Sequence, residues 1–216
     1  MATSENSLQV IYANMVQEAT SRLNSAQGFL TAYGMTARLP ELEAAVLQIR
    51  KSLESIALAS IAPNKVQYAA FRATATNSPD YTKDYHARKI FNTLEKVNKD
   101  FYPMALLPSV RQPDGSHHFG RKPSGFLSKK RFESVYDRLG KYLHAPNPWG
   151  TDKQLQNLVK ELPQIIDLAF GLLELHVTFI RTPQYNGAWV IEASRTGRPP
   201  RVITSMAKGD YAVQDS

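Results

Sequence analysis

The chain has 216 residues, of which 43% are hydrophobic and 21% are charged, and its excess of Lys and Arg gives a formal net charge of +7. This composition is typical of a globular protein with its own core and excludes a disordered chain, while the absence of cysteine excludes disulfides, zinc ribbons and iron–sulfur clusters. The basic balance, with a pI near 9.5, favours a polyanionic partner such as nucleic acid.

The first ten residues are polar, so they indicate neither a signal peptide nor a membrane span, and a cytoplasmic location without membrane association is expected. From Leu8 to about Thr31, apolar residues recur every three or four positions, which predicts a helix that Gly34 ends. Pro40 suits the first turn of a second helix. Because residues 42–61 are apolar on most faces, we expect this helix at the centre of the core.

A third helix is predicted from Tyr81 to Phe101, after a polar connector at 73–79, and Tyr85 is expected to face inward. Residues 103–127 then form a long basic loop that is rich in proline and glycine. Such a loop is too long to be a neutral connector, so it is expected either to carry function or to be disordered.

A fourth helix is predicted from Ser128, a suitable N-cap residue, to His144. Its apolar face consists of Phe132, Val135, Tyr136, Leu139 and Leu143. A fifth helix follows from Thr151 to about Leu173, and Pro163 is expected to kink or break it because proline lacks the amide donor.

After residue 174 the segments are rich in β-branched and aromatic residues, and Asn186-Gly187 and Thr196-Gly197 are turn signals between them. They predict an antiparallel three-stranded meander over 175–206. The expected fold is therefore mainly α, a bundle of about five helices with a small C-terminal antiparallel β meander. We divide it into a helical domain at 1–173, a β appendage at 174–208 and a disordered tail at 209–216.

The sequence contains no glycine-rich phosphate loop and no DxD or HExxH pattern, so neither a cofactor nor a bound metal is expected. Any chemistry would be done by Arg, His, Lys, Tyr and hydroxyl groups. His86 and His176 are expected to be solvated or packed in the core and to take no part in chemistry. The pair His117 and His118 lies in the basic loop, where it could touch a phosphate or a metal.

The end of the fourth helix carries the strongest chemical pattern. Asp137, Lys141 and His144 are spaced i, i+4 and i+7 and form a row along one face, and Arg138 lies on the adjoining face, about 120° from His144. Asp137 could orient His144, Arg138 could hold a phosphate, and Lys141 would add positive charge. The alternative is a plain helix terminus, with His144 near the negative end of the dipole and Arg138 in a surface ion pair with Asp137 or Glu133.

The segment Arg138-Leu-Gly-Lys-Tyr-Leu-His144 resembles the Arg-x(4 to 6)-His motif of the HEPN superfamily, late in a helical unit. Arg50 and Glu54, a polar pair one turn apart on the apolar second helix, are similar to polar positions on the inner helices of those proteins. The resemblance covers about residues 8–173 and leaves the β segment outside.

This resemblance implies a metal-independent endoribonuclease that acts as a homodimer, with two copies of the motif in one cleft. His144 would be the general acid or base and Arg138 would stabilise the phosphorane, leaving a 2′,3′-cyclic phosphate. DNA would be inert because it lacks the 2′-hydroxyl. By family analogy the biological role would be that of a toxin or an antiviral defence effector.

Further residues are expected to bind the RNA or the partner copy. Tyr142, Asn147 and Trp149 flank the motif, and the basic loop would follow the RNA backbone with four cations: Arg121, Lys122, Lys129 and Lys130. The fourth helix is expected at the dimer interface, with Gly140 permitting close approach. Two alternatives stay open, a non-catalytic RNA-binding or adaptor protein, and an inactive HEPN-like subunit that regulates a catalytic protein partner.

Overall fold

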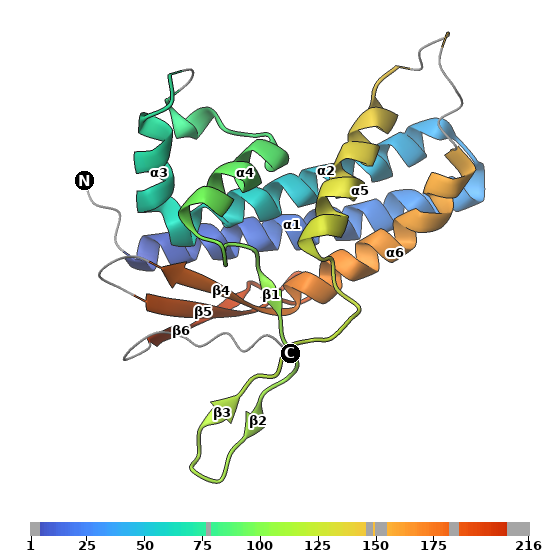
Figure 1. The fold of residues 1–216 in the computed structure, drawn as a ribbon. Coiled ribbons are helices and arrows are strands. Elements are labelled where there is room, and N and C mark those ends of the chain that lie inside the picture. Colours follow the sequence, from blue (N-terminus) through green and yellow to red (C-terminus); the bar gives the residue numbers. More distant parts are fainter. Residues whose placement is uncertain (1–4, 77–78, 146–148, 150–154, 182–185, 207–216) are drawn as a thin grey trace.

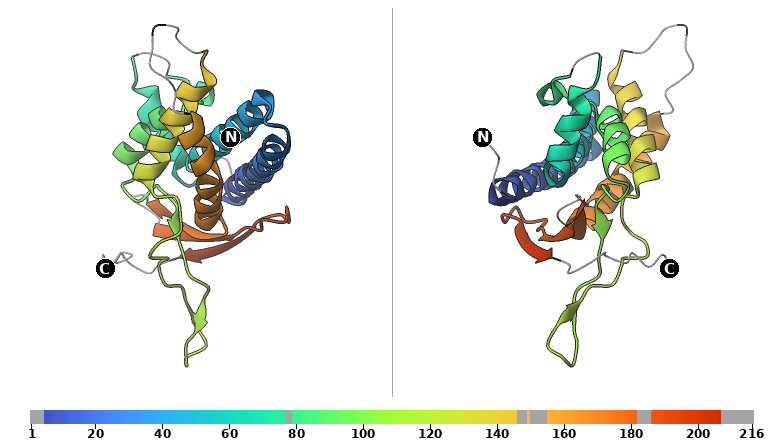
Figure 2. Two further views of the ribbon diagram at one scale, coloured as in Figure 1. Left: turned by 90° about the vertical axis from the view of Figure 1, so that its right-hand side faces the viewer. Right: turned by 60° about the vertical axis from the view of Figure 1, so that its left-hand side comes forward.

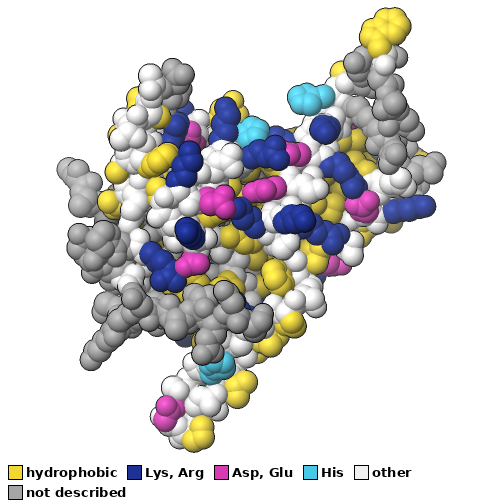
Figure 3. All heavy atoms as spheres, in the orientation of Figure 1, with side chains coloured by type: hydrophobic (Ala, Val, Ile, Leu, Met, Phe, Trp, Pro, Cys, Tyr) yellow, Lys and Arg dark blue, Asp and Glu magenta, His cyan; other side chains and the backbone are white. Residues whose placement is uncertain are grey.

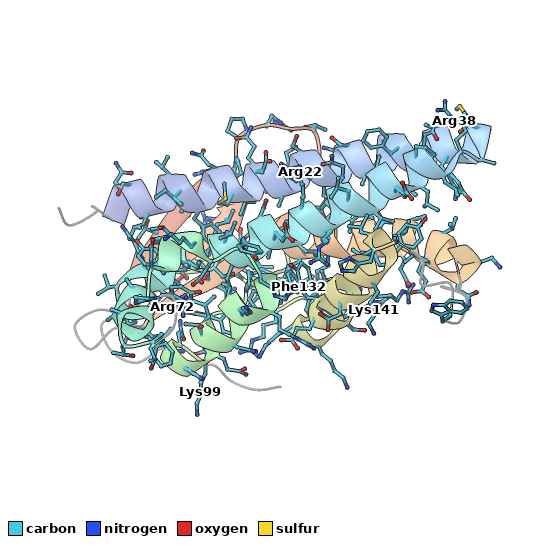
Figure 4. All side chains as sticks on the ribbon, turned by 90° about the horizontal axis from the view of Figure 1, so that it is seen from above. Arg22, Arg38, Arg72, Lys99, Phe132 and Lys141 are labelled. Carbon is cyan, nitrogen blue, oxygen red and sulfur yellow. The ribbon has the colours of Figure 1, made fainter. Side chains whose placement is uncertain are left out.

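A computed structural model describes residues 5–76, 79–145, 149, 155–181 and 186–206. Helix α1 (Glu5–Thr36) and helix α2 (Leu39–Ala59) form an antiparallel hairpin, which runs through the length of the molecule (Figures 1 and 4). The close approach of the two helices is held by the buried Ser52 hydroxyl, which donates to the Ala19 carbonyl over 2.9 Å. The prediction that the second helix is central to the core is confirmed, because ten of its residues are buried.

Three local predictions in this half of the chain need correction. Helix α1 continues past Gly34, and the left-handed residue that closes it is Ala37, with φ of 53°. The expected third helix is divided into a turn η2 (Tyr81–Lys83) and helix α4 (Ala87–Val97). Tyr85 lies between them and is 76% exposed, so it does not face inward. The short helix α3 (Lys65–Ala73), preceded by the turn η1 (Ala62–Asn64), was not predicted.

The long basic segment after α4 contains ordered strands. Strand β1 (Met104–Ala105) joins the C-terminal sheet, and β2 (Val110–Arg111) pairs with β3 (His117–His118) in a hairpin that projects from the body (Figures 1 and 2). Gly115, with φ of 84°, lies at the tip of that hairpin, where a side chain would be strained. The segment is therefore a β excursion from the helical body.

Helix α5 (Lys129–Leu143) and helix α6 (Leu155–Leu173) follow, and α6 continues through Pro163, so the proline does not end it. The N-cap predicted for the fifth helix, Thr151, lies outside the described residues. Strands β4 (Leu175–Arg181), β5 (Asn186–Glu192) and β6 (Arg201–Met206) form the predicted antiparallel meander, and β1 extends it to the order β1-β4-β5-β6. The prediction of a mainly α fold with a small antiparallel β meander is confirmed. Asn186 and Gly187 belong to β5 itself, whereas Gly197, with φ of 79°, occupies the second predicted turn.

The sheet lies against the long helices, beneath α1 in the view of Figure 1. Trp189 and Ile191 belong to the same core cluster as the buried faces of α1, α2, α5 and α6, so helices and sheet enclose one continuous core. The hydroxyl of Tyr12 on α1 reaches Nε2 of His176 on β4 over 2.9 Å inside it. This core fixes the positions of α5 and α6, on which the candidate site lies.

Candidate functional site

Helix α5 begins where the sequence predicts, because the Ser128 side chain accepts a hydrogen bond from the Arg131 amide. Its apolar face is fixed by burial: Phe132, Val135, Tyr136 and Leu139 are 9% exposed or less. Phe132 contacts the Phe91 ring of α4 with 4.7 Å between ring centroids. The opposite face of α5 must therefore point to solvent.

Two ion pairs join α5 to α4. Arg88 lies 2.9 Å from Asp137, and Lys129 lies 2.7 Å from Glu95. The partners are seven residues apart on α4 and eight apart on α5, in reverse order, so the two helices run antiparallel and side by side. Asp137, predicted to orient His144, forms an ion pair with Arg88.

The other flank of α5 contacts α6. Arg138 forms a 2.8 Å ion pair with Glu161, and the Arg131 guanidinium donates to the Gln164 amide oxygen over 2.8 Å. Both members of the Arg138–Glu161 pair are more than two-fifths exposed, so the pair is a surface one. Asp137 and Arg138 are thus held on opposite flanks of α5, by α4 and α6.

The row at the end of α5 faces solvent. Lys141 is exposed in the last turn, and His144 is the exposed C-cap residue, with extended backbone at φ of −78° and ψ of 150°. Figure 4 shows Lys141 on α5, on the side away from α1 and α2. Lys141 lies one helical turn after Asp137, and His144 follows the helix as its C-cap, while Arg138 faces α6.

The predicted substrate-binding residues near His144 are not alike. Tyr142 is partly buried, and this burial, with the charge of Glu43, raises the pKa of its hydroxyl. Trp149 is 92% exposed. Asn147 lies outside the described residues.

Of the four cations predicted to follow the RNA backbone, two form contacts within the fold and two are exposed. Lys122 donates from Nζ to the Gly171 carbonyl over 3.2 Å, and Lys129 pairs with Glu95 and lies 5.4 Å from the Phe101 ring centroid. Both therefore brace the structure. Arg121 forms an isolated bridge with Leu106 and is exposed, and Lys130 is exposed on the first turn of α5.

A polar cluster links α2 to the inner side of α5. Arg50 donates to the Tyr136 carbonyl over 3.0 Å, and its guanidinium lies 4.0 Å above the Tyr136 ring. The Tyr136 hydroxyl donates to Glu54 over 3.0 Å. Burial and the negative charge of Glu54 raise the pKa of the Tyr136 hydroxyl to about 12. The polar pair noted in the sequence thus holds α5 from inside.

Gly140 faces this cluster. A Cβ on Gly140 would overlap the Arg50 guanidinium nitrogen, so the bare side of this glycine is directed toward α2 of the same chain. The prediction that Gly140 permits close approach of a partner is therefore wrong: it makes room for Arg50.

Sequence reasoning missed the contribution of α4. Figure 3 shows Lys and Arg side chains gathered over α4 and α5, with acidic side chains between them. Arg88, Lys89 and Lys96 are exposed on α4. The polar side of this amphipathic helix carries these cations, but α4 precedes the basic segment 103–127 on which the sequence prediction was based.

No family model, curated protein or solved structure matches this chain. Within the described residues, no group of three or more His, Asp or Glu side chains is placed to hold a metal ion. In the same part of the chain, no helix is long and apolar enough to cross a membrane.

Proposed function

We propose that this protein is a metal-independent endoribonuclease, similar to HEPN proteins, that cuts single-stranded RNA at the C-terminal end of α5. The observation that carries the proposal is that α5 is fixed in the core along one side and presents Arg138, Lys141 and His144 to solvent along the other. These residues are the motif on which the resemblance depends. They lie beside the cationic surface of α4 and α5, which suits a phosphate backbone.

The chemistry assigned to the motif needs a proton carrier and a charge stabiliser. The His144 imidazole would take the proton of the ribose 2′-hydroxyl, or give one to the leaving 5′-oxygen, because an imidazole ring can both accept and donate a proton. The Arg138 guanidinium would bind the phosphorane oxygens as the negative charge develops. The bond from phosphorus to the 5′-oxygen breaks as the bond to the 2′-oxygen forms, so one product ends in a 2′,3′-cyclic phosphate.

A second copy of the chain would complete the site. Arg138 is held by Glu161 on the α6 side of α5, whereas Lys141 lies in the last turn of the helix and His144 is its C-cap. A two-fold axis beside the end of α5 would bring His144 of one protomer toward Arg138 of its partner. Light scattering at micromolar concentration should therefore give a dimer mass. A monomer that still cuts RNA would rule out this part of the proposal.

The deciding experiment is cleavage of a labelled single-stranded RNA in the presence of EDTA. His144→Ala should lower kcat by about 10² to 10⁴, the usual contribution of a general acid or base. His118→Ala, which removes an exposed histidine of the β2–β3 hairpin, is the matched control and should leave kcat unchanged. The products should end in 2′,3′-cyclic phosphate, and the all-deoxy oligonucleotide should stay intact. Cleavage that EDTA abolishes, or that survives in His144→Ala, would overturn the proposal.

A second function, RNA binding without cleavage, is favoured by one specific observation. The Arg138–Glu161 ion pair, at 2.8 Å, occupies the guanidinium that the chemistry needs. If this pair persists with RNA bound, the chain binds RNA but does not cut it. The result that identifies this function is salt-sensitive RNA affinity with no cleavage in either the wild type or Glu161→Gln.

A further inference from the structure

The two helices α4 and α5 hold most of the net charge of the chain. Together they carry eight Lys and Arg residues and three Asp and Glu residues, a difference of +5, while the whole chain has a formal charge of +7. They comprise only 26 of the 216 residues. A single face that concentrates positive charge in this way attracts a polyanion by releasing its counterions.

The ion pairs divide this face into bound and accessible cations. Arg88 and Lys129 are neutralised by acidic residues along the seam between the two helices, and Arg138 is neutralised on the α6 side. Lys89, Lys130 and Lys141 are exposed and take part in none of the ion pairs within the described parts of the chain. Lys89 follows Arg88 on α4, and Lys130 and Lys141 lie two turns before and one turn after Asp137 on α5. All three therefore lie on the exposed surface of the two helices that meet at the seam, where they can contact phosphates.

Exposed aromatic rings lie beside the same helices. Tyr85, directly before α4, is 76% exposed, and Phe71 on α3 is 38% exposed with the Lys96 ammonium 5.4 Å from its ring centroid. Basic surfaces with exposed aromatic rings are typical of proteins that bind single-stranded nucleic acid, because unpaired bases stack on the rings. A duplex would keep its bases away from them.

The antiparallel arrangement gives this surface a direction. Arg88 at the start of α4 pairs with Asp137 in the second half of α5, so the N-terminal end of α4, next to Tyr85, lies toward the end of α5 that carries Lys141 and His144. Glu95 and Lys129 mark the opposite end. A strand that follows the seam therefore reaches Tyr85 on its way to His144.

We propose that single-stranded RNA binds along the α4–α5 seam, held by Lys89, Lys130 and Lys141, with a base stacked on Tyr85 beside the end of α5. The choice of RNA rests on the proposed function. Of the four cations that the sequence predicted to follow the RNA, this track keeps Lys130 and leaves out Lys122 and Lys129, which are engaged within the fold.

The test compares two variants with the same change of charge, both in the His144→Ala background so that cleavage cannot interfere. The seam variant is Lys89→Gln with Lys130→Gln, and the excursion variant is Arg111→Gln with Arg121→Gln. Affinity for a fluorescent single-stranded RNA is measured by anisotropy across a series of salt concentrations. The seam variant should reduce the log–log salt slope by about 1.4, or 0.7 for each lost phosphate contact, and the excursion variant should keep it.

Tyr85→Ala supplies an independent readout, because base stacking does not depend on salt. It should weaken binding on the order of 10-fold with an unchanged salt slope, and Tyr85→Trp should restore the affinity. Since these side chains are exposed, thermal melts should match those of the parent chain. An unchanged slope in the seam variant, a lowered slope in the excursion variant, or duplex RNA binding as tightly as the single strand would each overturn the inference.

Failure of this inference can be told apart from failure of the proposed function. If the seam variant binds RNA weakly but the wild type cuts no RNA, RNA binding along the seam is supported and the nuclease proposal is wrong. If the wild type cuts RNA with EDTA present while the seam variant binds normally, the nuclease proposal stands and the seam is wrong.

Discussion

Gly140 occupies the interior of α5, where glycine costs about 1 kcal/mol relative to alanine. Its presence is explained by Arg50, whose guanidinium fills the space where a Cβ would be and donates to the Tyr136 carbonyl. In an α-helix that carbonyl also accepts from the amide of residue 140, so the arginine shares an oxygen with the helix backbone. The absent side chain is what lets α2 hold α5.

Gly140→Ala should therefore destabilise the protein by about 1–3 kcal/mol, in spite of the better helix propensity of alanine, because Arg50 must move. Gly28→Ala is the matched control, since Gly28 lies inside α1 with no atom within 4 Å of the added Cβ. It should stabilise the protein by up to about 1 kcal/mol. Urea unfolding measures both free energies.

The cause is checked in an Arg50→Ala background, where the obstacle is gone. There Gly140→Ala should become neutral or stabilising, which gives a coupling free energy between the two sites. Equal costs in both backgrounds would show that the guanidinium is not what makes alanine unfavourable.

His176 is buried between α1 and α6. Its Nδ1 lies 3.0 Å from the Leu173 carbonyl, which can only accept, so Nδ1 carries the proton and Nε2 accepts from the Tyr12 hydroxyl. Burial lowers the pKa of His176 to about 4. The folded protein thus holds this ring neutral under conditions in which an unfolded chain would begin to protonate it.

The pH dependence follows from this difference. Because the unfolded state, with a pKa of about 6.5, binds the proton first, the free energy of unfolding is highest above pH 6.5 and falls as the pH drops toward 4. Between pH 7.5 and pH 5 the loss from this residue should be about 2 kcal/mol. Urea unfolding at both values measures it, and His176→Gln should remove most of the dependence. If the free energy of unfolding of His176→Gln changes with pH as much as that of the wild type, the pH dependence comes from other groups.

At the scale of elements, periodicity and capping residues predict structure that depends on neighbouring residues, such as a single helix. Ser128 and the apolar spacing that follows it place α5 almost to the residue, because both signals lie within the helix itself. The two-residue strand β1 could not be predicted, since Met104 and Ala105 show no period and pair with a strand more than 70 residues later. Helix α3 was not predicted, because it has only nine residues and Tyr68 is the one residue of it that is buried.

The candidate site divides in the same way. Spacing alone put Asp137 and His144 in one row of the fourth helix and Arg138 on the adjoining face, and in the structure His144 and Arg138 are exposed. Spacing could not identify their partners, because Arg88 and Glu161 come from helices that only the tertiary fold brings alongside.

At the contact between α5 and α6, Glu161 holds the Arg138 guanidinium in an ion pair. Glu161→Gln removes the ion pair and a negative charge beside it, so RNA affinity should rise by up to about fivefold, or ~1 kcal/mol. Stability should change by less than about 1 kcal/mol because the pair is exposed. Glu192→Gln, which breaks the Arg201 pair on the sheet, is the control and should leave anisotropy titrations unchanged. Equal affinity gains in both variants would indicate a general charge effect.

At the scale of the whole molecule, the sheet covers apolar surfaces of the helices. Trp189 and Ile191 pack into the same core as α1 and α6, and Ile180 joins them. A chain truncated after Leu173 should therefore keep helical circular dichroism but lose cooperative unfolding and bind a hydrophobic dye.

The β2–β3 hairpin provides the control. Replacing residues 109–118 by Gly-Gly should keep cooperative unfolding, since Val110, Arg111, His117 and His118 are all exposed. If the truncated chain unfolds cooperatively, the helices are stable alone.

The contact between the start of the chain and its last strands also sets when folding can finish. Gln9 bonds Thr204 across 195 residues, and Tyr12 meets His176 across 164. At a synthesis rate of about 5–20 residues per second, the N-terminal half of α1 waits roughly ten seconds or more on the ribosome before its covering strands emerge. During that interval the apolar surface around Tyr12 is open to chaperones and proteases, so the newly made chain should depend on chaperones more than its finished stability would suggest.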